Sequence, residues 1–484
     1  MMSTKRSFAF LSVVLGASAV ASAQSAPSIG FFDWDTTDNT GFANFSPTPF
    51  LTDSNAAQVA SVLSASQAAG KTLAVKITTP LTSTAAKNIF NQFNVKYVFC
   101  DFEDTQAVGR TRAIADLVLN SSQSSNAFVG NFNFYPNASN DGTRPTGSTD
   151  PTGKAFSFDN KPFSSQYTDS RGKTATKTGK LMANESLYPG SPDFRNPAQG
   201  NSNAPNIRSA LFTLPILRAG NTTSALPSGD QHIPWVSRFN NYGNSALDSD
   251  GNPNNGFVFD ATAGSVNAGQ LPSRGDFQAQ IQHYRLRGAT SVNMFEAASN
   301  SATQGNGSVL GYTRAQARDD IRTGWSASNV TNQVFARNNY AFANLGSTVN
   351  VFPANNNQTP QTVSSESAGV IFSGVYDKAG ASGVRALAVL ISNMSAVEKW
   401  VDLPTIGGLE TYNAGAARRD DYLVPAGTHR LLTFQFGTNR WNLTSNSLQF
   451  TDANRNGVGV PEPTTAALLG VGAVGLLVRR RRTA

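Results

Sequence analysis

The feature that most constrains the fold is an alternation of short apolar runs with stretches of helical period. The apolar runs have the length of strands and lie at 28–34, 72–77, 96–102, 127–134, 180–185, 232–238 and 290–295. Helical stretches separate several of them, at 55–69, 83–93, 109–120, 206–218 and 276–288. This α/β alternation favours a parallel sheet, and seven such units predict a (β/α) barrel of about seven to eight strands over residues 24–351. A doubly wound open sheet is the alternative, less favoured because no Gly-x-Gly-x-x-Gly turn follows the first run.

The pattern changes after a linker at 352–367 that is rich in Asn, Pro, Gln and Thr. The runs "GVIFSGVYD", "GVRALAVLIS", "EKWVDLP" and "HRLLTFQF" are strand-like and are broken by Gly, Pro and Asn. Residues 368–452 are therefore expected to form a small antiparallel β-sandwich beside the barrel. Such an accessory domain either stabilises its neighbour or binds glycan, and the sequence leaves both roles open.

The N-terminal residues are expected to direct export. Lys5 and Arg6 precede an apolar run at 8–20, and Ala21-Ser22-Ala23 has the small-x-small form that a signal peptidase accepts. Residues 1–23 are therefore interpreted as a signal peptide, with the mature chain beginning at Gln24. A short membrane anchor is less favoured because the run is too short to span a bilayer.

The C-terminal residues 453–484 carry a second targeting pattern. Pro461, Glu462 and Pro463 precede 15 uncharged residues, and Arg479, Arg480, Arg481 and Arg482 follow. As a helix the uncharged segment would be about 22 Å long, shorter than the roughly 30 Å hydrocarbon core. This order resembles the bacterial PEP-CTERM sorting signals. The resemblance implies export, a transient association with the inner membrane through a short transmembrane segment, processing by an exosortase, and delivery to the cell surface or extracellular matrix.

Charge and cysteine content exclude some classes of function. The chain carries +7, but removing Lys5, Arg6, Glu462 and the four arginines at 479–482 leaves +2. No basic cluster remains between them, so a nucleic-acid partner is not expected. The single cysteine, Cys100, cannot form an internal disulfide, and three scattered histidines give no zinc pattern. Neither a metal nor an organic cofactor is expected.

The stretch "KYVFCDFED" at 96–104 is the strongest candidate site. Alternate side chains of a strand share a face, so Phe99, Asp101 and Glu103 are expected to point one way, and Cys100 and Phe102 the other. Two acids at the carboxyl end of a strand occupy the position where barrel enzymes carry their catalytic groups. Close carboxylates raise one another's pKa, which keeps one protonated as a general acid. The plainer interpretation is a solvated acidic turn that caps the next helix.

Other strand ends carry polar groups suited to a sugar ligand. Amides and tyrosines can donate and accept hydrogen bonds, and further carboxylates could supply a second catalytic group. Besides Asp101 and Glu103, the candidate set is Asp33, Asp35, Asn131, Asn133, Tyr135, Glu185, Tyr188, Arg238 and Glu296.

The segments "CDFED", "NFNFYP" and "NESLYPG" resemble those of the hyaluronidase-like glycoside hydrolases, whose barrels carry an Asp-x-Glu pair at the third strand. The resemblance implies that Glu103 protonates the glycosidic oxygen and that Asp101 orients a 2-acetamido group acting as internal nucleophile. A substrate without that group requires a second carboxylate, for which Glu296 or Glu185 is the candidate. The chain lacks that family's disulfides.

The leading functional hypothesis is an exported, surface-sorted protein that resembles a glycoside hydrolase and acts on polysaccharide by carboxylate acid/base catalysis. The alternatives are a non-catalytic carbohydrate-binding protein and a structural protein of the surface or matrix. Acids gathered in one place favour the enzyme, and scattered acids favour binding or scaffolding.

Overall fold

The computed structural model describes most of the predicted elements. The described residues are 31–33, 45–102, 107–131, 164–168, 174–178, 180–184, 187, 204–205, 207–226, 230–237, 273–294, 314–326, 328–353, 358–378, 385–414 and 421–450. Within these ranges no helix is both long and apolar enough to cross a membrane. Both targeting segments predicted from the sequence, including the short transmembrane segment, lie outside the described residues.

The N-terminal part is built on two parallel sheets. The larger has the strand order β3 (Ala74–Ile77), β4 (Tyr97–Cys100), β5 (Phe128–Asn131), β8 (Lys180–Ala183) and β9 (Gln231–His232). The smaller has the order β10 (Trp235–Val236), β11 (Asn293–Met294), β1 (Phe31–Asp33) and β2 (Phe45–Pro47). An isolated parallel bridge joins Phe50 to Lys76.

The two faces of these strands pack against different partners. Val98, Cys100 and Phe102 pack outward into a cluster with α1 (Ala56–Ala68), α2 (Thr84–Gln92) and α3 (Ala107–Leu119). Phe99 packs on the opposite face with residues of both sheets: Phe32, Ala74, Tyr97, Met182, Ile233 and Trp235. We call this the inner face. The alternation predicted for 98–102 is thus confirmed.

The prediction of a closed (β/α) barrel is wrong. The seven predicted strands and five predicted helices all fall on strands and helices, but the strands form separate sheets of four and five. The regular repeat fails at two places within the described residues. None of them forms a helix between β1 and β2, and between β5 and β8 they form an antiparallel hairpin of β6 (Ser164–Thr168) and β7 (Thr174–Thr178). Local periodicity predicts elements, but lateral pairing decides whether a sheet closes.

The C-terminal part consists of two mainly antiparallel sheets. The six-stranded sheet has the order β12 (Tyr340–Phe342), β15 (Val370–Asp377), β16 (Ala386–Asn393), β20 (Thr428–Gly437), β21 (Arg440–Gln449) and β18 (Thr411–Tyr412). The four-stranded sheet has the order β14 (Gln361–Ser364), β13 (Thr348–Val351), β17 (Lys399–Asp402) and β19 (Asp421–Val424). One apolar cluster contains residues of both, including Val349, Val389 and the fully buried Trp441. Three of these strands, β12 to β14, precede residue 368, where the sandwich was predicted to begin.

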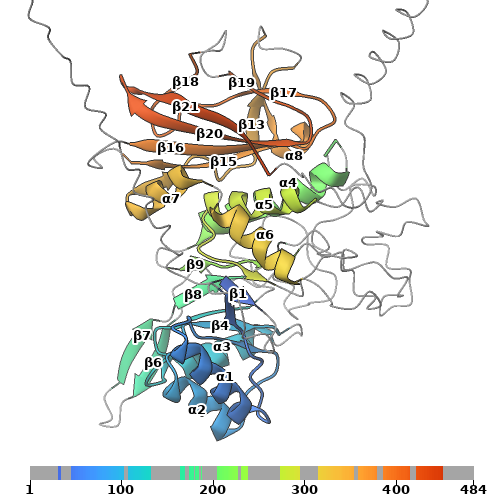
Figure 1. Cartoon of the computed structure of the whole chain (residues 1–484). Coiled ribbons are helices and arrows are strands. Elements are labelled where there is room, and N and C mark those ends of the chain that lie inside the picture. The colour runs from blue at the N-terminus through green and yellow to red at the C-terminus, as the bar shows by residue number, and fades with distance from the viewer. Residues whose placement is uncertain are drawn as a thin grey trace, which may run out of the picture.

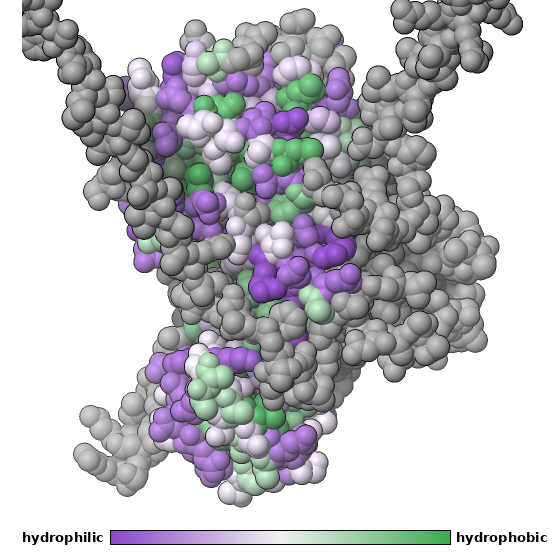
Figure 2. Space-filling view, viewed as in Figure 1, coloured by the Kyte–Doolittle hydropathy of each residue, from purple (hydrophilic) through white to green (hydrophobic). Residues whose placement is uncertain are grey.

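Helices α4 (Ile207–Ala225), α5 (Arg274–Leu286) and α6 (Arg314–Ser326) form a layer between the two parts (Figure 1). The short helices α7 (Asn329–Ala336) and α8 (Ser365–Ala368) lie against β15. Figure 2 shows a strongly hydrophilic patch over α6, where Arg322 and Asp319 form an exposed ion pair. The opposite face of α6 buries Ile321 and Trp325. At the end of β21, Phe450 packs against the cluster around α4 and α5 and also against the one around α7.

Candidate functional site

The inner face carries a buried ion pair. Lys76, fully buried in β3, shares the inner face with Phe99, its register partner. Its ammonium lies 2.6 Å from Oδ2 of Asp101, the residue that directly follows β4. The rings of Phe50 and Trp235 stand 4.7 and 4.8 Å from the same nitrogen. A charge taken out of water needs such compensation, because unpaired burial costs several kcal/mol.

Asp101 is the accessible end of this pair. Its side chain is 12% exposed, whereas that of Lys76 is 0% exposed. The carboxylate therefore stands between a buried cation and the surface. Held by an ammonium group, a carboxylate acts as a hydrogen-bond acceptor or a fixed negative charge.

Two buried amides share this face. Asn293 is the register partner of both Trp235 and Phe32. Asn184 directly follows β8, and a Cβ added to Gly130 would lie 3.1 Å from its Oδ1 atom. Both side chains are almost completely buried, and neither the oxygen nor the nitrogen of either amide has a hydrogen-bond partner among the described residues. Buried amides are rarely left without partners, so these two point to a polar ligand or to ordered water.

Asp33 and Asn131 lie elsewhere. Asp33 accepts a hydrogen bond at 2.7 Å from Nε of Arg318 and is paired with its guanidinium, so it binds β1 to α6. Asn131 donates to Thr111 on α3 at 3.1 Å and to the Phe102 carbonyl at 3.4 Å. Both therefore hold helices or adjoining backbone in place on the side away from Lys76.

Of the predicted site residues, the structure thus places Asp101 on the inner face, and Asp33 and Asn131 outside it. The other predicted residues lie outside the described part of the chain: Asp35, Glu103, Asn133, Tyr135, Glu185, Tyr188, Arg238 and Glu296. Their roles remain predictions.

Sequence reasoning missed Lys76, Trp235, Asn184 and Asn293. A usable signal was present in "TLAVKITTP", because a lysine inside an apolar strand run must be paired if that face is buried. Neither asparagine gave a signal, since asparagine is frequent along the whole chain.

Two other titratable groups near this face have shifted pKa values. Burial raises the pKa of Tyr97 to about 12, partly offset by the hydrogen bond that its hydroxyl donates to Gln231. Burial, together with the neighbouring Asp101 charge, raises the pKa of the Cys100 thiol far above its ordinary value. Cys100 therefore stays a thiol, and a thiolate nucleophile is excluded at this strand end. In the described ranges no group of three or more His, Cys, Asp or Glu residues could hold a metal ion.

Comparison with known families identifies one match. The PEP-CTERM protein-sorting motif matches residues 459–482, which include the Pro-Glu-Pro triplet and the arginine cluster. The motif marks an exported protein. It indicates sorting to the cell surface or extracellular space and processing by an exosortase-type enzyme. No curated protein and no solved structure matches the chain. The glycoside-hydrolase resemblance expected from the short segments gains no support from these comparisons.

Proposed function

We propose that this surface-sorted protein binds a polysaccharide at the inner-face cluster, where Asp101 acts as the fixed acceptor for sugar hydroxyl or amide groups. The observation that carries the proposal is the set of groups on the inner face: the paired carboxylate of Asp101 and two buried amides, Asn184 and Asn293, whose polar atoms have no hydrogen-bond partner among the described residues. Sugars present many donors and acceptors, and amide and carboxylate side chains are suited to bind them.

Hydrolysis is the finer part of the proposal and depends on Glu103. Asp101, held by Lys76, does not have to supply a proton in this scheme. A general acid is still needed to protonate the leaving oxygen, and Glu103 is the sequence-predicted candidate. Loss of that group would leave a protein that binds glycan without cleaving it.

The test measures binding and cleavage separately. The purified protein is incubated with a panel of polysaccharides that includes acetamido-sugar polymers, and bound protein and released reducing ends are both measured. Glu103→Gln is expected to keep binding and to lower cleavage by about 10²–10⁴-fold, the usual contribution of a general acid. Asp319→Asn, which changes an exposed carboxylate on α6, is the matched control and should leave both quantities unchanged.

The amides provide the sharper test of binding. Asn184→Leu and Asn293→Leu remove groups that make no hydrogen bond within the described residues, so folding stability should be kept or raised. Both amides are buried in the structure, so the proposal requires the inner face to open when glycan binds. Glycan binding should then fall about tenfold or more in each variant, because about 1.4 kcal/mol of lost hydrogen bonding corresponds to a factor of ten. Unchanged binding in both variants would refute the assignment of this site. If the unaltered protein binds glycan but does not cleave it, its function is non-catalytic carbohydrate binding.

A further inference from the structure

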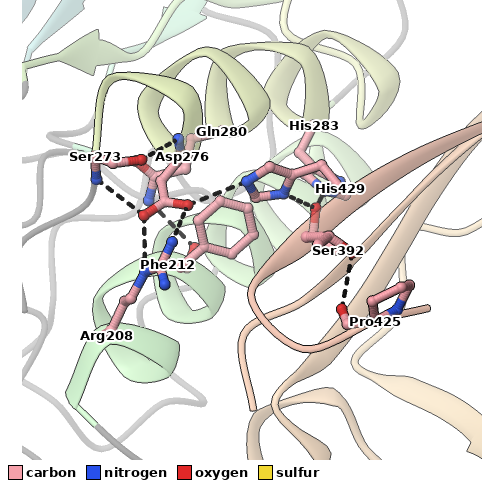
Figure 3. Close-up of polar contacts among 10 residues, drawn as sticks. Arg208, Phe212, Ser273, Asp276, Gln280, His283, Ser392, Pro425 and His429 are labelled. Carbon is pink, nitrogen blue, oxygen red and sulfur yellow. Dashed lines mark hydrogen bonds and ion pairs between the residues drawn. The ribbon is translucent and has the colours of Figure 1, made fainter. Parts of the chain in front are cut away.

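A chain of buried side-chain hydrogen bonds crosses the boundary between α5 and the six-stranded C-terminal sheet (Figure 3). Asp276 and His283 belong to α5, Ser392 to β16 and His429 to β20. Two of the three histidines in the protein lie in this chain of hydrogen bonds. The contacts of His283 with Ser392 and of Asp276 with His429 join residues more than 100 positions apart in sequence.

The chain has five links. His429 Nε2 lies 3.1 Å from Oδ1 of Asp276, and its Nδ1 lies 2.8 Å from Ser392 Oγ. Ser392 Oγ lies 2.8 Å from Nε2 of His283, whose Nδ1 lies 2.8 Å from Ser373 Oγ on β15. Arg287 ends the chain, with Nε 2.7 Å from Ser373 Oγ.

Asp276, His429 and Ser392 have the order of a hydrolytic triad, but burial argues against that role. Ser392 is 0% exposed, and both His429 and Asp276 are buried. The Ser392 hydroxyl is also shared between two imidazoles. A nucleophile must reach its substrate, so this arrangement serves the fold.

When both imidazoles are neutral, the two ends fix the direction of every hydrogen bond. Arg287 can only donate and the Asp276 carboxylate can only accept. Ser373 therefore accepts from Arg287 and donates to Nδ1 of His283. The Nε2–H of His283 then donates to Ser392, which donates to Nδ1 of His429, whose Nε2–H donates to Asp276. Each neutral imidazole in this pattern carries its proton on Nε2.

An added proton has no favourable place in this pattern. A proton on Nδ1 of His429 or of His283 would turn an acceptor into a donor that faces a serine hydroxyl already donating in that direction. The serine hydroxyl would have to accept this hydrogen bond instead of donating it. Its own hydrogen would then have no acceptor, or would point at the donor of the next hydrogen bond along. Buried unsatisfied donors cost about 1–3 kcal/mol each.

The surrounding charges oppose proton uptake as well. Arg287 faces His283 from one turn along α5, and β15 and β16 face it with serine hydroxyls. Across His429, the Asp276 charge is already balanced by Arg208 of α4, which donates from Nε at 2.9 Å and from Nη2 at 2.7 Å. Phe212 of α4 packs against both rings, with centroids 5.8 Å from His283 and 5.3 Å from His429. Burial, and then the Arg287 charge, lower the pKa of His283 well below its ordinary value.

We propose that this chain is an acid-sensitive lock between α5 and the C-terminal sheets, closed while both histidines are neutral and weakened when the open form takes up a proton. His283 is ionised more readily when exposed, because its pKa is lowered only in the folded state. The lock is therefore at full strength above about pH 6.5, the unfolded pKa of histidine, and weakens as the pH falls below it.

The first test uses the unaltered protein. With ¹⁵N-labelled histidine, the three imidazoles give separate nitrogen signals, and His232→Gln assigns the ring that lies outside the chain. The expected result at pH 7 is a neutral ring with its proton on Nε2 for both His283 and His429. His283 should remain neutral well below pH 6.5. A proton on Nδ1 of either ring at pH 7, or titration of His283 at an ordinary pKa, would overturn the proposal.

The second test asks whether the effect is local to this boundary. Hydrogen exchange is measured between pH 7 and 5, corrected for its intrinsic pH dependence, over 274–287 and 370–377, with 56–92 of the N-terminal part as internal reference. Opening at the boundary should increase about tenfold per pH unit below 6.5 relative to the reference, the response to one extra proton. His283→Gln, if it folds, should remove this dependence. Equal changes in both parts of the unaltered protein would contradict a local lock.

Discussion

The two sheet-bearing parts of the molecule differ in the length of their longest strands. In the C-terminal part, β15 and β16 are eight residues long, and β20 and β21 are ten. In the N-terminal part, the strands of the two parallel sheets have two to four residues. Long antiparallel ladders keep their backbone groups paired over a wide area. Short strands end soon, and the residues just after them, such as Asp101 and Asn184, are available for other roles.

The two parts also differ in the kind of side chain that they bury. All eight residues of β16 are buried, and the cluster shared by the C-terminal sheets is apolar. The inner face of the parallel sheets instead buries Lys76, Asn184 and Asn293 beside its aromatic residues. The C-terminal part also buries polar side chains, such as Ser392 and His429, but these two are hydrogen-bonded to each other. Both polar atoms of Asn184 and of Asn293 have no partner among the described residues, and this difference separates a supporting scaffold from a candidate site.

The largest effect that would test this contrast concerns the ion pair. Asp101→Asn removes the carboxylate that lies 2.6 Å from the fully buried Lys76 ammonium, and we expect the free energy of unfolding to fall by about 3–5 kcal/mol. Lys76→Met should cost less, because Asp101 is partly exposed and can be hydrated. Urea denaturation of both single variants and of the double variant measures this. A loss below about 1 kcal/mol for Asp101→Asn would mean that the pair is not effectively buried.

Two glycines, one in each part, allow the packing between neighbouring strands to be compared. A Cβ at Gly130 would lie 2.3 Å from the Met182 carbonyl oxygen of the adjacent parallel strand, and one at Gly374 would lie 2.7 Å from that of Ala388. Gly→Ala should therefore destabilise both parts by about 1–3 kcal/mol, and Gly130 by more. Thermal unfolding of the two variants gives the order. A milder effect at Gly130 would indicate that the short strands shift easily.

The smallest expected change in stability concerns the residues that cap two helix N-termini. Ser83 caps α2 by accepting from the Ala86 N–H at 3.1 Å, and Ser328 caps α7 by accepting from the Thr331 N–H at 3.1 Å. Each Ser→Ala change should cost about 1 kcal/mol. Ser328 is buried and water cannot replace its hydroxyl, so it should cost more than the half-buried Ser83. Equal denaturation midpoints would place both caps in similar contact with solvent.

The sequence predicted local structure better than assembly. Strand runs such as 96–102 and helices such as 83–93 have periodicities that depend only on nearby residues, and both formed where expected. The barrel did not follow, because sheet closure depends on pairings between distant strands that no local pattern encodes. The face on which Asp101 lies was predictable from alternation. Its partner Lys76 was not, since the pairing of β3 with β4 brings the two together.

Phe450 gives the sorting tail a mechanical connection to the rest of the protein. Phe450 packs against two apolar clusters, each of which contains residues of α5 and of the six-stranded sheet, and its ring lies 6.3 Å from that of His429. The residues that carry the sorting motif, 459–482, follow it along the chain. When the tail is held at a membrane or pulled by a processing enzyme, Phe450 is the first of the described residues, counted back from the motif, to bear that tension. The load then falls on the boundary between α5 and the C-terminal sheets, so tethering and acidity would act on the same joint.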